Sequence, residues 1–112
     1  MNKLIVALGN PGKKYESTRH NVAWQAFARL AFHSELTWKN KFKGVYADYL
    51  NHETKFIFLM PQTYMNLSGF SVQDCMNFFK ISPQETLVVH DEVDIPYGVC
   101  AFKKGGGLAG HN

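Results

Sequence analysis

Hydrophobic and polar positions follow one another along the chain in blocks that predict strands and helices in turn. Nearly continuous apolar runs at 3–8, 55–60 and 86–90 are typical of short strands covered on both faces. From Asn21, apolar residues recur at the spacing of one helix face, which predicts a helix ending near residue 33 or 34. A second helix is predicted over 67–79, with Val72, Cys75, Met76 and Phe79 on its buried face.

Shorter elements fill the remaining segments. The segment 42–50 reads as a strand that forms a hairpin with 55–60 through the loop 51–54, and Pro61 ends the second strand. We expect 36–41 to be irregular, 82–85 to form a short capped turn, and 98–103 to form a last short strand.

Strands that alternate with helices predict the α/β class. We expect a mixed, mostly parallel sheet with helices on both faces, a three-layer α/β/α arrangement. The 112 residues, 46% of them hydrophobic, suit a single catalytic domain over 1–112.

Polar side chains cluster in the loops that follow the three apolar strands. The first of these loops, 9–21, carries Asn10 and His20; the second carries Tyr64 and Asn66, and the third begins with Asp91. If the three strands run parallel, these loops leave the same edge of the sheet and form one site.

His20 and Asp91 suggest acid–base chemistry. An imidazole is partly neutral near physiological pH and is a suitable general base, and a carboxylate can orient it. Each residue also has a structural interpretation: His20 could bond to the backbone at a helix start, and Asp91 could cap a turn.

Other kinds of chemistry find less support in the sequence. His90 and Asp91 are adjacent at a strand end and so face opposite ways, which argues against a metal site. Ser68 lacks the glycine pattern of a nucleophile elbow, and Cys75 and Cys100 lie in apolar segments typical of buried thiols. A histidine–aspartate pair that activates water for hydrolysis of an ester-like bond is the simplest remaining chemistry.

The basic residues favour an anionic partner modestly. The formal net charge is +3, and a solvated lysine surface is the ordinary alternative. Tyr15 and Tyr64 could stack on bases. The candidate phosphate contacts are Lys13, Lys14, Arg19, Lys39, Lys41, Lys43, Lys103 and Lys104.

Several blocks of residues, in order along the whole chain, closely resemble the bacterial peptidyl-tRNA hydrolases. The blocks are Leu4-Ile5-Val6-Ala7-Leu8-Gly9-Asn10-Pro11-Gly12, Tyr15-Glu16-Ser17-Thr18-Arg19-His20-Asn21, Pro61-Gln62-Thr63-Tyr64-Met65-Asn66-Leu67-Ser68-Gly69, Val89-His90-Asp91-Glu92-Val93-Asp94 and Gly110-His111-Asn112. The resemblance implies hydrolysis of the ester between a peptide and the 3′-terminal ribose of tRNA, which recycles tRNA from aborted translation.

The same resemblance implies a role for each matching residue. His20 is the general base for water, Asp91 keeps its imidazole basic and oriented, and Asn10 helps to recognise peptidyl-tRNA. Residues implied to contact the tRNA end or the peptide are Tyr15, Tyr64, Met65, Asn66 and Asn112. The resemblance implies no cofactor and no metal. The two cysteines in apolar surroundings suit a reducing cytosol, and no apolar run has the length of a membrane span, so we expect a cytoplasmic protein without a membrane partner, and a monomer.

Two departures from the family pattern stand at the carboxyl end. Gly107-Leu108-Ala109-Gly110 lacks the histidine and glycine that many relatives carry in the middle of this loop. Family members also continue well past Asn112. We therefore expect the chain to be the amino-terminal part of a longer protein, with an incomplete sheet and weak activity by itself. Two alternatives are a non-catalytic RNA-binding fragment and an esterase of small molecules.

Overall fold

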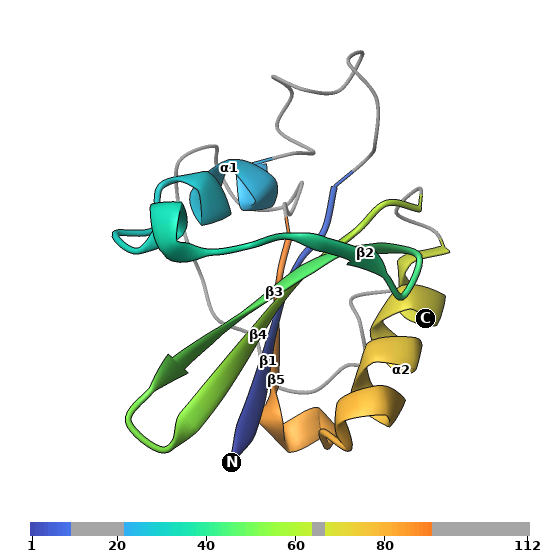
Figure 1. Cartoon of the computed structure of the whole chain (residues 1–112). Helices are drawn as coiled ribbons and strands as arrows, with labels where there is room; N and C mark the ends of the chain where they lie inside the picture. Colours follow the sequence, from blue (N-terminus) through green and yellow to red (C-terminus); the bar gives the residue numbers. More distant parts are fainter. Residues whose placement is uncertain (10–21, 64–66, 91–112) are drawn as a thin grey trace.

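The computed structural model describes residues 1–9, 22–63 and 67–90, which form one sheet with a helix on each side (Figure 1). The strands are β1 (Asn2–Ala7), β2 (Lys39–Lys41), β3 (Gly44–Asn51), β4 (Thr54–Pro61) and β5 (Thr86–Val89). The helices are α1 (Val22–Ala28), α2 (Ser68–Phe79) and the single 3₁₀ turns η3 (His33–Glu35) and η5 (Pro83–Glu85).

The sheet is mixed, with the strand order β2-β3-β4-β1-β5. β1 lies parallel to both β4 and β5, whereas β3 runs antiparallel to β4 and to β2. The predicted parallel arrangement of the three apolar strands and the predicted hairpin are both confirmed. The expected strand at 98–103 lies outside the described residues.

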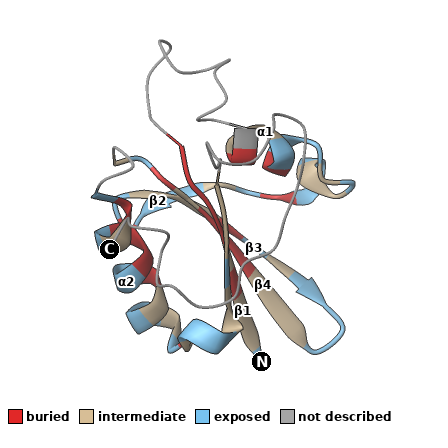
Figure 2. Ribbon diagram, turned by 180° about the vertical axis from the view of Figure 1, so that it is seen from behind, coloured by how far each residue is buried: buried red, intermediate tan, exposed pale blue. Residues whose placement is uncertain are grey.

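Alternate residues of the central strands point to opposite faces of the sheet and pack into two separate cores. Leu4, Val6 and Leu59 pack with Val72 of α2 on one face, whereas Ala7 and its neighbours pack with α1 on the other. Figure 2 shows buried residues following β1, β4 and the inward side of α2, while the β3–β4 turn is exposed. The three-layer α/β/α prediction is therefore confirmed for the described residues.

Two predictions between α1 and β3 are wrong. α1 ends at Ala28, about five residues early, and the chain continues through turns and η3 before β2 begins at Lys39. Residues 29–38 pack as an irregular segment because Leu30, Phe32 and Trp38 all contact the α1-side core. Residues 39–41 were expected to be irregular, but they pair with β3 as an edge strand.

A turn between β2 and β3 occupies the first two positions of the strand predicted from residue 42. Phe42 and Lys43 form a two-residue hairpin turn with φ values of 59° and 56°, and β3 begins only at Gly44. Positive φ at both turn positions matches the right-handed twist of the strands, although glycine and asparagine are the usual residues there. A Cβ at Gly44 would lie 2.5 Å from the Met60 carbonyl oxygen, so only glycine fits beside β4.

The turn before β5 forms as predicted. Pro83 lies at the start of η5, and Glu85 Oε1 accepts hydrogen bonds from the Ser82 amide at 3.2 Å and hydroxyl at 3.0 Å. These bonds lower the pKa of Glu85. No helix in the part of the chain that the structure describes is long and apolar enough to cross a membrane.

Candidate functional site

The carboxyl ends of β1, β4 and β5 meet at one edge of the sheet. β1 pairs in parallel with both neighbours, and beyond the last ladder pair the Leu8 amide still donates to the Val89 carbonyl oxygen at 2.9 Å. Gly9, Thr63 and His90 are the last described residues before the three gaps, and each follows one of these strands. This sheet edge is the candidate site, as expected for the carboxyl ends of parallel strands.

All eight predicted site residues lie outside the described residues. Asn10 follows directly after Gly9, Tyr64 after Thr63, and Asp91 after His90. The parallel strands therefore bring Gly9, Thr63 and His90 to the same edge of the sheet, and each of the three predicted residues follows one of them in the sequence. The eight residues are Asn10, Tyr15, His20, Tyr64, Met65, Asn66, Asp91 and Asn112.

A tryptophan fixes the first helix to this edge. The Trp24 indole Nε1 donates to the Ala7 carbonyl oxygen at 2.8 Å, where β1 ends. Because this carbonyl is near the last pair of the ladder, the bond fixes α1 against the end of β1. Sequence reasoning missed this role. The only signal was that Trp24 lies next to Ala23 on the buried face of the helix.

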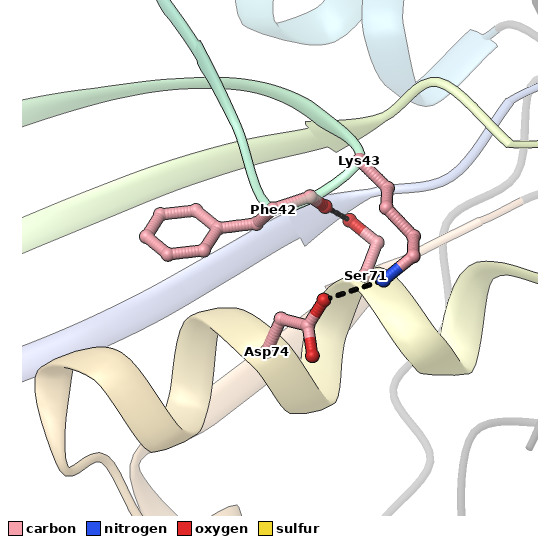
Figure 3. Close-up of polar contacts among 4 residues, drawn as sticks. All are labelled: Phe42, Lys43, Ser71 and Asp74. Atoms are coloured by element: carbon pink, nitrogen blue, oxygen red, sulfur yellow. Dashed lines mark hydrogen bonds and ion pairs between the residues drawn. The ribbon is translucent and has the colours of Figure 1, made fainter.

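The β2–β3 turn is held to α2 beside the same edge. The Ser71 hydroxyl donates to the Phe42 carbonyl oxygen, and Lys43 Nζ lies 2.8 Å from Asp74 Oδ2 (Figure 3). The backbone N–H of Gln62 donates to the Lys43 carbonyl oxygen at 2.9 Å, which connects the turn to the end of β4. The turn therefore joins the candidate edge to the outer side of α2.

Two buried hydroxyl groups lie at Thr63, after β4, and at Ser68, where α2 begins. Thr63 Oγ1 and Ser68 Oγ are buried, and neither has a hydrogen-bond partner within the described segments. Ser68 is only 1% exposed.

Cys75 is an unsuitable nucleophile, as the sequence suggested. It is a free thiol in the α2-side core, and burial raises its pKa to about 12. A neutral thiol in an apolar core is a packing residue. Cys100 lies outside the described residues. Among the side chains that the structure describes, no three His, Cys, Asp or Glu residues gather closely enough to hold a metal ion.

A mixed α/β sheet with polar loops at the carboxyl ends of its parallel strands is the architecture of many enzymes. The sequence profile of the peptidyl-tRNA hydrolases matches residues 4–112. The chain therefore belongs to the peptidyl-tRNA hydrolase family.

Individual relatives agree with this assignment. The peptidyl-tRNA hydrolase of Pasteurella multocida is 50% identical over 98% of this chain and 58% of its own length. That of Paracoccus denitrificans is 48% identical over 98% of this chain and 47% of its own. The crystal structure of the Acinetobacter baumannii peptidyl-tRNA hydrolase superposes with a TM-score of 0.86 at 41% identity, covering 97% of this chain and 57% of that one.

The chain spans about half the length of the curated relatives it matches. The shared region includes the sheet, both helices and all eight predicted site positions. Membership of the family is thus established over this region.

Proposed function

We propose that the protein is a peptidyl-tRNA hydrolase, which hydrolyses the ester between a peptide and the 3′-terminal ribose of tRNA. The observation that carries the proposal is the family match over residues 4–112. The convergence of the ends of β1, β4 and β5 supports it, because Asn10, Tyr64 and Asp91 directly follow the described residues there.

In the proposed mechanism, His20 acts as general base. Its neutral imidazole takes a proton from water as the water oxygen attacks the ester carbonyl carbon. The C–O bond to the ribose then breaks, and the proton returns to the ribose oxygen that leaves. Asp91 stays ionised and accepts a hydrogen bond from the other ring N–H, so that it fixes the tautomer and stabilises the imidazolium.

The remaining proposed residues bind the substrate. Asn10 contributes a carboxamide beside His20 that recognises the peptidyl linkage, and Asn66 offers a second neutral hydrogen-bonding group. Met65 lines the path of the peptide. The residues proposed to contact the tRNA end are Tyr15, Tyr64, Asn66 and Asn112.

The proposed substrate suggests where and in what form the protein acts. Peptidyl-tRNA arises in the cytoplasm during translation, and the free buried thiol of Cys75 suits a reducing compartment. We propose that the protein acts as a monomer.

Replacement of the proposed base tests the mechanism. In His20→Ala, we expect turnover of a peptidyl-tRNA to fall by at least about 10²-fold, the usual contribution of a general base, while tRNA binding stays within about twofold. The measurement is single-turnover hydrolysis together with a tRNA-binding titration on the same preparation.

A second histidine provides the matched control. His52 lies exposed in the β3–β4 turn with a φ of 58°, at the opposite edge of the sheet, and asparagine tolerates that backbone conformation. His52→Asn should therefore keep full turnover. Normal hydrolysis by His20→Ala would exclude the proposed mechanism, and tRNA binding without hydrolysis by the unaltered protein would favour a binding role alone.

A further inference from the structure

The exposed ring of Phe78, on α2, forms a cation–π contact with Lys41 of β2. Phe78 is 55% exposed, although its ring lies 5.3 Å from that of the buried Phe42. Lys41 Nζ lies 4.3 Å from the centre of the Phe78 ring and 5.7 Å from that of Phe42. The cation–π contact holds an otherwise flexible ammonium group in one place.

The three lysines of the β2–β3 hairpin differ in their partners. Lys43 is neutralised by Asp74 at 2.8 Å. Lys39 and Lys41 are exposed on the edge strand β2, and neither forms an ion pair with an acid in the described part of the chain. Two cationic groups therefore remain available on this strand.

Both available lysines project on the α2 side of the sheet. Lys39 pairs with Tyr46, which packs against the α2-side core, and Lys41 lies two positions further along the same strand. Residues two apart on a strand share a face, so the two ammonium groups and Phe78 form one surface. We call Lys39, Lys41 and Phe78 the lysine–phenylalanine surface.

One end of this surface, the backbone of Lys41, lies at the candidate edge. Its other end, Phe78, lies in the last turn of α2, where the Phe79 carbonyl oxygen accepts a hydrogen bond from Asn2 at the amino end of β1. Lys41 pairs with Gly44, and Gly44 pairs with Pro61 at the carboxyl end of β4. Neighbouring strands lie about 4.8 Å apart, so Lys41 is about 10 Å from the end of β4 and about 14 Å from β1 along the sheet edge. A substrate that is only an ester would not reach so far, but a polyanion attached to the ester would.

We propose that the lysine–phenylalanine surface binds the RNA backbone of the substrate, outside the terminal nucleotide that carries the peptide. Lys39 and Lys41 contact phosphates, and Phe78 is a positioning residue that holds Lys41. This inference rests on the proposed function, because it assigns a surface to part of the same substrate. The surface extends from the candidate edge at Lys41 along α2 to Phe78, so it suits a long polyanion that continues from the ester, which an RNA does and a separate acidic peptide does not.

The test compares a full-length substrate with a short one that shares the ester. Lys39→Gln/Lys41→Gln should raise KM for peptidyl-tRNA about tenfold at low salt, and leave hydrolysis of a peptidyl ester of the terminal adenosine unchanged. For uncharged tRNA, the slope of log affinity against log salt should become shallower by about 0.7 to 0.9 for each lysine lost. Phe78→Leu should give a smaller loss of the same kind.

Two further variants act as matched controls. Lys55→Gln removes the same charge at the start of β4, at the other edge of the sheet, where Lys55 pairs with Asp48 at 3.7 Å; it should change neither KM nor the slope. Asp74→Asn frees Lys43 from its partner, so it should strengthen tRNA binding.

The outcomes separate this inference from the proposed function. An unchanged salt slope for tRNA in the double variant would overturn the inference and favour a protein partner for the surface. Equal loss of turnover on both substrates would also overturn it, since this would indicate damage to the site itself. If the unaltered protein hydrolyses neither substrate, the proposed function fails, whereas the tRNA-binding slopes still decide whether the surface binds RNA.

Discussion

The two faces of the sheet are packed by different means. On the α2 side, the aliphatic residues Leu4, Val6, Ile57 and Leu59 are all 0% exposed beneath a regular helix of 12 residues. The rings of Phe42, Tyr46 and Phe79 pack beside this aliphatic centre, which we call the aliphatic face. On the α1 side, the helix has only seven residues, and aromatic rings complete the layer. One face is thus covered by a periodic element and the other by an irregular one.

The aromatic face shows how an irregular segment can be fixed in place. Phe32 stacks on Tyr49 with ring centres 4.0 Å apart, and Phe27 meets Phe58 edge to face at 5.3 Å. Such pairs contribute about 0.5 to 1.5 kcal/mol beyond the area that they bury. Specific ring contacts therefore replace helical regularity between α1 and β2.

Substitutions at two adjacent residues of β4 test this difference between the faces, and they are expected to have the largest effect on stability. Leu59→Ala, on the aliphatic face, should lower the free energy of unfolding by about 2 to 5 kcal/mol, because it opens a cavity beneath α2. Phe58→Leu keeps an apolar side chain on the aromatic face and removes only the ring contacts, so it should cost about 1 to 2 kcal/mol. Urea unfolding of both variants measures the two values.

The reverse order, with Phe58→Leu costing more than Leu59→Ala, would mean that the aromatic face is the main source of stability. A change in the slope of the unfolding transition would be a separate finding, since it reports on altered compactness and not on lost contacts.

The same contrast explains which parts of the fold could be predicted. The apolar runs of β1, β4 and β5 and the periodic face of α2 depend on local pattern, and they were predicted to within one or two residues. α1 was predicted too long because Leu30, although correctly spaced for a helix face, packs from a turn. The spacing of apolar residues does not show whether tertiary contacts keep Leu30 within the helix or in the segment that follows it.

The β2–β3 turn was missed for a related reason. Phe42 and Lys43 are not turn-forming residues, so nothing local indicates a positive φ. The burial of the Phe42 ring and the bond from Ser71 to its carbonyl oxygen offset the unfavourable backbone conformation. The Ser71 bond joins residues 29 positions apart, and the Phe42 ring packs on Phe78 and Phe79 from the far end of α2, so sequence pattern does not reveal these contacts.

Two buried serines of α2 give the second prediction. Ser71→Ala should cost about 1 to 3 kcal/mol, because it leaves the buried Phe42 carbonyl oxygen without its donor. Ser68 is equally buried, but its hydroxyl has no partner in the described ranges. Ser68→Ala should therefore change stability by less than about 0.5 kcal/mol or increase it. Thermal and urea unfolding of the two variants provide the comparison.

A loss as large for Ser68→Ala as for Ser71→Ala would show that the Ser68 hydroxyl is bonded in the folded protein. The aliphatic face would then be tied to the segment at 64–66 by a polar contact, and the site could not be treated as independent of that core.

The candidate site was predictable in its position but not in its geometry. Parallel pairing of β1 with β4 and β5 is enough to bring Gly9, Thr63 and His90 to one edge, and it follows from the order of strands and helices. The proposal of His20 as the base rests on residue chemistry and on family resemblance. The hydrogen bond from Trp24 to the Ala7 carbonyl oxygen depends on how α1 packs against β1, and no sequence motif predicts it.

The smallest effect concerns Cys75 and appears only in alkaline solution. Burial raises the pKa of this thiol from 9.0 to about 12, because the apolar face beneath α2 disfavours the thiolate. Below pH 9 the thiol is neutral in the folded and the unfolded chain, and its contribution to stability is fully present. Between pH 9 and about 12 the unfolded chain ionises first, so stability falls as pH rises. In a Cys100→Ser background, the protein should lose stability more steeply than its Cys75→Ala variant above pH 9, and the two urea-unfolding curves should keep a constant offset below it. Parallel pH profiles across the alkaline range would show that water reaches the thiol, and that the aliphatic face is less well sealed than its packing indicates.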